Sequence, residues 1–209
     1  MSDHCHDHGC SATAATSPRY RRVLWVALGV NAAMFGVEIA AGVGSGSVSL
    51  LADAVDFFGD AANYALSLAV LGMGLARRAR AAWIKGASMG VFGLFVLGRA
   101  AFVATGDSVP EPITMGLVGA LALAANVGVA VLLYAWREGD ANMRSVWLCS
   151  RNDAIGSLAV MAAALGVFGT GSAWPDLLVA GVMAVLALSA ARTVVAQARQ
   201  ELLPFTVRA

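Results

Sequence analysis

Charged residues are scarce in this chain of 209 residues, making up 13% against 59% apolar residues. With a mean hydropathy of +0.73, this scarcity excludes an ordinary water-soluble domain and indicates a small bundle of membrane helices. The formal net charge is +1, and no basic cluster is longer than four residues. Binding to nucleic acid relies on many phosphate contacts, so a nucleic-acid partner is not expected.

Cysteine and histidine are also rare, with three of each. Two of the cysteines lie in the first ten residues, so a disulfide framework is excluded and free thiols are expected. No histidine follows residue 8 to act as a base, and neither a phosphate-binding glycine loop with lysine nor a Gly-x-Ser-x-Gly elbow occurs. We therefore expect no enzyme activity and no cofactor.

Six apolar runs of about 20 or more residues are long enough to cross a bilayer. They predict an all-α membrane protein with six transmembrane helices. The first run has spanning length and follows about twenty polar residues, which is unlike a signal peptide. The runs are Val23 to Val43, Ser49 to Leu75, Ala81 to Thr105, Thr114 to Trp136, Ser145 to Gly169 and Leu177 to Val195.

Arginines lie in alternate connections between these runs, which the positive-inside rule assigns to the cytoplasm. The three other connections have no Lys or Arg, so both termini are expected to be cytoplasmic. We expect a disordered tail over 1–20, a transmembrane domain over 21–199 and a short cytoplasmic tail over 200–209. The expected location is the cell membrane of a bacterium, with the lipid bilayer as a partner.

A polar stripe runs along the second predicted helix. Asp53, Asp56, Asp60 and Asn63 follow one another at steps of three, four and three, which places them on one helix face. A carboxylate at the bilayer centre costs about 2.5 to 3.5 kcal/mol, so such groups usually face a cavity, a partner or an ion. The alternatives are that Asp53 caps the start of the helix, or that protonated carboxyls form interhelical hydrogen bonds.

A second stripe, Cys149, Asp153 and Ser157, recurs every four residues along the fifth predicted helix. Four ligands at i and i+4 on two helices suit Zn²⁺, which accepts both thiolate and carboxylate. A single cysteine such as Cys149 is more often a small apolar residue packed in a core than a metal ligand. Its spacing from Asp153 favours a role as a metal ligand. Further intramembrane polar groups either line a pathway or make interhelical hydrogen bonds, and these are Asn31, Glu38, Arg99 and Asn126.

The sequence resembles the cation diffusion facilitator family of divalent-metal transporters over its whole six-helix region. The matching segments are Asn31 to Glu38, Gly46 to Asp60, Asn126, Leu148 to Ser157 and Trp174 to Asp176. By motif position, the resemblance implies a central metal site of Asp56, Asp60, Cys149 and Asp153. Asp53 and Asn63 are expected to support it from a second shell or along the pathway.

This chain departs from the family pattern in two ways. Cys149 stands where the usual ligand is His, and the softer thiolate favours Zn²⁺ and Cd²⁺ over Mn²⁺ or Fe²⁺. Only about ten residues follow the last predicted helix, so we expect no cytoplasmic C-terminal domain of the kind through which most members form dimers, and a homodimer is one of two possibilities.

All three histidines and two cysteines lie in the first ten residues. A short His/Cys tract is typical of metal capture, with an incidental polar tail as the alternative. The residues are His4, Cys5, His6, His8 and Cys10.

These features together predict efflux of Zn²⁺ or Cd²⁺ as substrate in exchange for protons. Three carboxylates and a thiol at one low-dielectric site cannot all ionise without a cation, so metal and protons compete for them. A membrane metal sensor that binds without transport is the first alternative. A drug/proton antiporter is weaker, because a site for organic cations would offer aromatic faces.

Overall fold

The computed structural model describes residues 18–69, 75–106, 108–136 and 141–206. Within its helices, the side chains of residues 75, 76, 78, 136, 141–151 and 203–206 lie outside that description. All regular secondary structure in the described part of the chain is helical. Its elements are α2 (Pro18–Ser45), α3 (Val48–Ala69), α4 (Leu75–Ala104), α5 (Pro112–Leu133), the 3₁₀ turn η2 (Tyr134–Trp136), α6 (Ala141–Thr170) and α7 (Trp174–Thr206).

Five of these six helices are long and apolar enough to cross a membrane, and α3 is the exception. Every 18-residue window of α3 contains Asp53, Asp56 and Asp60, so its charge excludes it from a purely compositional definition of a span. Nevertheless, α3 packs against more of the other α-helices than any other described α-helix does, since it contacts α2, α4, α6 and α7. The carboxylates therefore enter the bundle on an interior helix.

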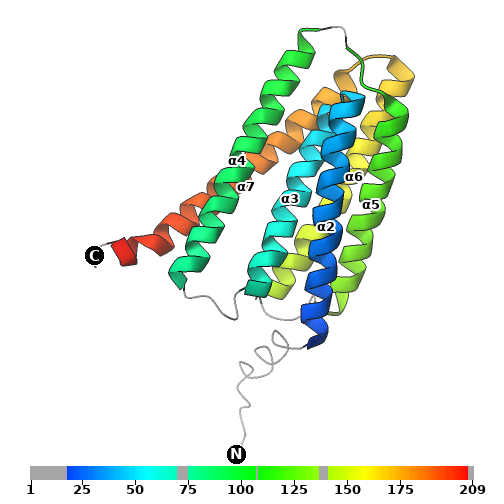
Figure 1. Ribbon diagram of the computed structural model, residues 1–209. Helices are drawn as coiled ribbons and strands as arrows, with labels where there is room; N and C mark the ends of the chain where they lie inside the picture. Colours follow the sequence, from blue (N-terminus) through cyan, green and yellow to red (C-terminus); the bar gives the residue numbers. More distant parts are fainter. Residues whose placement is uncertain (1–17, 70–74, 107, 137–140, 207–209) are drawn as a thin grey trace, which may run out of the picture.

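The helices are paired by their packing. α2 packs chiefly against α3, α5 against α6, and α4 against α7. In Figure 1, α2, α3, α5 and α6 run side by side, whereas the C-terminal half of α7 leans away with α4 beside it. The site described below lies where α3 faces α4, α6 and α7.

The helices extend beyond several of the predicted spans. α4 begins at Leu75, which the prediction gave to the previous span, and α7 continues through Thr206 rather than ending near Val195. Hydropathy marks the part of a helix that lies at membrane depth, whereas residues such as Gln197 and Arg199 are polar but good helix formers. Apolar runs therefore underestimate helix length.

A short turn joins α2 to α3, and α7 supplies the cap of α3. Gly46 adopts a φ of 75°, a conformation that residues with a Cβ rarely take. The Asp176 carboxylate at the start of α7 accepts hydrogen bonds from the backbone N–H groups of Val48 (2.8 Å) and Ser49 (3.0 Å) and from the Ser47 hydroxyl (2.7 Å). The first turn of α3 is thus fixed to α7.

Small residues allow α4 and α7 to approach closely, as the abundance of Gly and Ala suggests. A Cβ added to Gly86 would lie 2.9 Å from Val195 Cγ2 and 3.3 Å from the backbone oxygen of Ala191. A Cβ added to Gly93 would lie 3.1 Å from the Leu188 side chain. Backbone contact of this kind holds the leaning pair together.

Candidate metal centre

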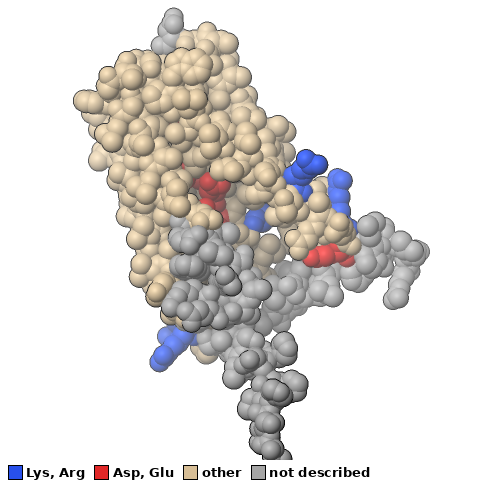
Figure 2. Space-filling view, turned by 180° about the vertical axis from the view of Figure 1, so that it is seen from behind, with Lys and Arg blue, Asp and Glu red and all other residues tan. Residues whose placement is uncertain are grey.

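Three predicted ligands line one partly open cavity between the helices of the bundle. Asp56 and Asp60 from α3 and Asp153 from α6 surround a space of about 340 Å³. Asn63, Lys85 and Met89 line the same cavity. Figure 2 shows acidic side chains within a hollow, below a broad part of the surface that carries no charged side chains. Helical spacing and packing thus bring carboxylates from two helices together, as the sequence predicts.

A second cavity of about 450 Å³ reaches two of these carboxylates from between α6 and α7. Asp56 and Asp153 line both cavities, together with Ala190 of α7. The second cavity is otherwise mainly apolar, with Asn152 among its polar lining residues. The pair Asp56 and Asp153 therefore lies at the junction of two spaces within the bundle.

Asp60 is the most enclosed of the three carboxylates, with 6% of its surface exposed. The buried Tyr64 hydroxyl, one turn further along α3, donates to Asp60 Oδ2 at 3.0 Å. Asp60 also lies within hydrogen-bonding reach of the Asp153 carboxyl group across the helix interface. Two ionised carboxylates cannot share a hydrogen bond, so this approach requires a proton or a cation between them.

Asp53 does not cap α3, so the capping alternative is wrong. It lies five residues inside the helix, whose first N–H groups are bound by Asp176 instead. The Ser157 hydroxyl of α6 donates to Asp53 Oδ2 at 3.3 Å, with the Asp153 carbonyl oxygen as its second acceptor at 3.2 Å. Asn126 of α5 in turn donates to Ser157 Oγ at 3.1 Å. Asp53 thus belongs to a fully buried polar network beside the cavity.

The other intramembrane polar groups have separate environments. Asn31 donates to the Ala27 carbonyl oxygen of its own helix at 2.8 Å, and the Arg99 guanidinium lies 5.9 Å from the centre of the Phe102 ring. Glu38 is completely buried and faces Asp53. Within the described residues, no donor reaches either carboxyl oxygen of Glu38 or Oδ1 of Asp53. These two acids can hydrogen-bond to each other only when one of them is protonated.

The remaining predicted ligands lie outside the described residues. Cys149 is on α6, one helical turn before Asp153, but its side chain is not described, and neither is that of Arg151. The N-terminal tract of His4, Cys5, His6, His8 and Cys10 also precedes the described chain. Among the described side chains, no three His, Cys, Asp or Glu groups lie close enough to hold a metal ion as they stand. Asp56, Asp60 and Asp153 share a cavity without closing around its centre.

Sequence reasoning missed the roles of Lys85 and Asp176. Lys85 lies within the third predicted span, has 9% of its surface exposed and donates to Asn63 Oδ1. A lone lysine in an apolar run was a signal for a buried partner, but the run does not say which one. Asp176 was placed in a connection, whereas it is completely buried and caps α3.

The helices and the site together define an integral, multi-pass membrane protein that gathers carboxylates in a cavity between its helices. The cation efflux transmembrane domain matches residues 24–203. The chain therefore belongs to the cation efflux family, also called the cation diffusion facilitators, whose members are transporters and not enzymes. It is similar to the zinc transporter ZitB of Escherichia coli, with 28% identity over 213 residues covering 95% of this chain and 67% of that protein. The zinc transporter ZitB of Shigella flexneri matches to the same extent.

Proposed function

We propose that this transporter exports Zn²⁺ or Cd²⁺ from the cytoplasm in exchange for protons. The observation that supports this function best is the cavity where Asp56, Asp60 and Asp153 meet from two helices. A divalent cation is the ligand that such a set of carboxylates suits in a low-dielectric interior. Similarity to two zinc transporters favours Zn²⁺.

The proposed direct ligands are Asp56, Asp60, Cys149 and Asp153. Because Cys149 lies one turn before Asp153 on α6, helical periodicity places both on one face of that helix. Asp53 supports this set from outside the cavity, through Ser157, whereas Asn63 lines the cavity and holds the Lys85 ammonium group there. The cavity is wider than a coordination sphere with Zn–O distances of about 2.0–2.2 Å, so the ligands rotate inward on binding.

Proton exchange follows from the chemistry of the same groups. The approach of Asp60 to Asp153 needs a proton or a cation between them. A divalent metal supplies the positive charge that otherwise comes from protons, so loading the metal releases protons from the site. Alternating opening of the site to the two sides of the membrane then couples outward metal movement to inward proton movement.

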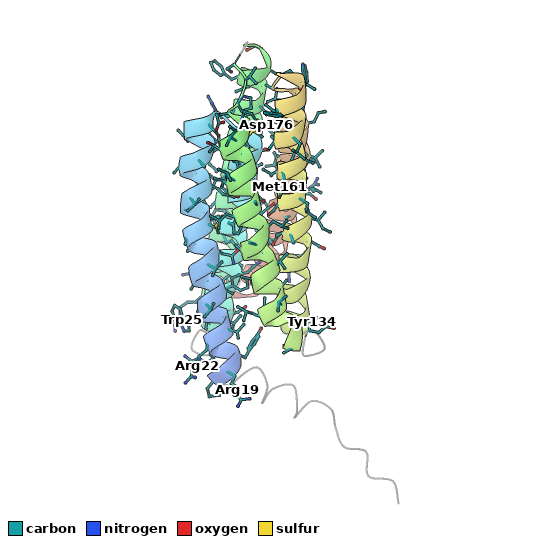
Figure 3. All side chains as sticks on the ribbon, turned by 90° about the vertical axis from the view of Figure 1, so that its right-hand side faces the viewer. Arg19, Arg22, Trp25, Tyr134, Met161 and Asp176 are labelled. Atoms are coloured by element: carbon teal, nitrogen blue, oxygen red, sulfur yellow. The ribbon has the colours of Figure 1, made fainter. Side chains whose placement is uncertain are left out.

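The proposed topology has six crossings, with α3 as the sixth span and both termini in the cytoplasm. Arg19 and Arg22 lie at one end of the bundle, whereas Asp176 lies near the other, as Figure 3 shows. The positive-inside rule makes the arginine end cytoplasmic. The N-terminal His/Cys tract, which includes His4 and Cys10, is proposed to capture metal at that side.

The test is Zn²⁺ and Cd²⁺ flux into proteoliposomes under an imposed pH gradient. We expect flux that follows the gradient in the natural protein and is abolished in Asp60→Asn and in Asp153→Asn. Asparagine keeps the size of the side chain but has no carboxylate, so it can neither bind the metal through a negative charge nor release a proton in exchange for it. Correct insertion of each variant is checked by a monodisperse elution profile in detergent.

Asp176→Asn is the matched control, since it makes the same chemical change to a buried aspartate outside the cavity. Flux is expected to persist in that control. Flux that survives in both cavity variants would remove these carboxylates from the mechanism. Metal binding without flux in the natural protein would instead favour a membrane metal sensor.

A further inference from the structure

Lys85 is the only lysine in the sequence and lies within an apolar span. It comes ten residues after the start of α4, or about 15 Å along the helix axis at 1.5 Å per residue. Only 9% of its surface is exposed. Burying an ammonium group is costly unless it is paired, so the groups around Lys85 indicate its role.

The partners of Lys85 belong to the proposed metal site. Its ammonium group donates to Asn63 Oδ1, and Asn63 lies three residues after Asp60 on α3. The ammonium also attracts the Asp60 carboxylate electrostatically. Lys85 lines the same cavity as Asp56 and Asp153. One covalently tethered cation therefore shares a confined space with three carboxylates.

A metal ion entering this cavity meets the positive charge of Lys85. Two cations near the same carboxylates repel each other, and the repulsion is poorly screened in a low-dielectric interior. Lysine carries its charge on a flexible four-carbon stem, which lets the ammonium withdraw while the backbone stays in place. The lysine and the metal therefore compete for Asp60.

We propose that Lys85 is a tethered counter-cation of the metal site, which balances Asp60 when the metal is absent and weakens metal binding when it is present. This inference rests on the proposed function, since it assigns a role at the same site. The competition lowers the affinity for the transported metal and speeds its release. Lys85 is thus a residue that positions charge, not a metal ligand.

The test measures Zn²⁺ affinity and transport kinetics separately. Zn²⁺ binding to the full chain in detergent is measured by competition with a chromophoric chelator, and flux is measured in proteoliposomes over a range of Zn²⁺ concentrations. Lys85→Gln removes the charge but still donates a hydrogen bond to Asn63. We expect both Kd and KM to fall about tenfold, within the range of about 5- to 150-fold typical of coupled sites. We also expect kcat to fall, because release becomes slower.

Three further variants distinguish an effect of the Lys85 charge from effects of packing or of any intramembrane charge. Lys85→Arg keeps the positive charge and should retain Kd and KM near those of the natural protein. Arg99→Gln removes another described cation from the same apolar span of α4, outside the cavity lining, and should leave Kd unchanged. Lys85→Leu is a second neutral variant with the same expected tightening, in case Lys85→Gln is not recovered as folded protein.

The outcomes separate this inference from the proposed function. Folded Lys85→Gln with unchanged or weaker Zn²⁺ binding overturns the counter-cation, even if the natural protein shows pH-driven flux. Tighter binding in Lys85→Gln without flux in the natural protein keeps the counter-cation and removes the antiporter. An equal fall in Kd in Arg99→Gln would mean that loss of any cation from this span strengthens Zn²⁺ binding, and it would also overturn the inference.

Discussion

Ser157 links the two polar stripes through a single hydroxyl proton. Its Oγ lies 3.3 Å from Asp53 Oδ2 of α3 and 3.2 Å from the Asp153 carbonyl oxygen of α6, while Asn126 donates to it. One hydroxyl cannot donate fully to both acceptors at once. The state of Asp53 is therefore connected to the backbone that carries a proposed ligand.

Replacement of Ser157 by alanine should destabilise the protein. Asp53 would lose its donor in a fully buried position, and an unsatisfied buried polar group costs about 1 to 3 kcal/mol. We expect a lower thermal unfolding midpoint in detergent, with Ser189→Ala as the control because Ser189 is an exposed serine on α7. A midpoint equal to that of the natural protein would show that this network adds nothing to stability.

Replacement of Cys149 by histidine should change metal preference. The thiolate favours soft metals, whereas imidazole accepts a wider range of divalent ions. We expect the ratio of Cd²⁺ to Zn²⁺ flux to fall in Cys149→His. Cys149→Ala should lose affinity for both metals, and a Cd²⁺ to Zn²⁺ ratio that is the same in all three proteins would place the thiol outside the site.

At the scale of single elements, α3 depends on α7 for its start. The Asp176 carboxylate accepts two backbone N–H groups and the Ser47 hydroxyl, all from a segment more than a hundred residues away in sequence. Helices more often take such a cap from a residue just before their first turn. Here the cap also joins the first and last parts of the bundle.

Loss of this cap should therefore weaken both the helix and its contact with α7. Removing an N-cap costs about 0.5 to 2 kcal/mol, and the buried N–H groups of Val48 and Ser49 would be left without their acceptors. We expect Asp176→Ala to lower the thermal midpoint clearly and Asp176→Asn to lower it less, since the amide keeps one acceptor oxygen. Equal midpoints for Asp176→Ala and the natural protein would contradict this role.

The sequence predicts the helices better than it predicts their partners. Periodicity places Asp56, Asp60 and Asn63 together, and the structure gives them one cavity. The same periodicity groups Asp53 with them, but the Asp53 side chain contacts Ser157 outside the cavity. Residues on one face of a helix can contact different neighbours at different heights along the helix. Neither Lys85 nor Asp176 could be assigned a partner from spacing, since their contacts join helices far apart in the chain.

At the scale of the whole molecule, the number of crossings decides where the two ends of the chain lie. Six crossings place both ends on one side, whereas five would separate them. Green fluorescent protein, which fluoresces only in the cytoplasm, should fluoresce when fused at either end. Alkaline phosphatase, which is active only outside the inner membrane, should be active when inserted between Gly106 and Ser108. Fluorescence from only one end would exclude α3 as a span.

The three aspartates of α3 also affect how the chain enters the membrane during synthesis. Each intramembrane carboxylate opposes insertion by about 2.5 to 3.5 kcal/mol, so α3 has little tendency to leave the translocon for lipid alone. The turn through Gly46 brings α3 directly back against α2, which is apolar enough to insert by itself. We therefore expect α2 and α3 to enter the bilayer as one helical hairpin, and the site carboxylates to become enclosed only when α4, α6 and α7 pack against the other side of α3.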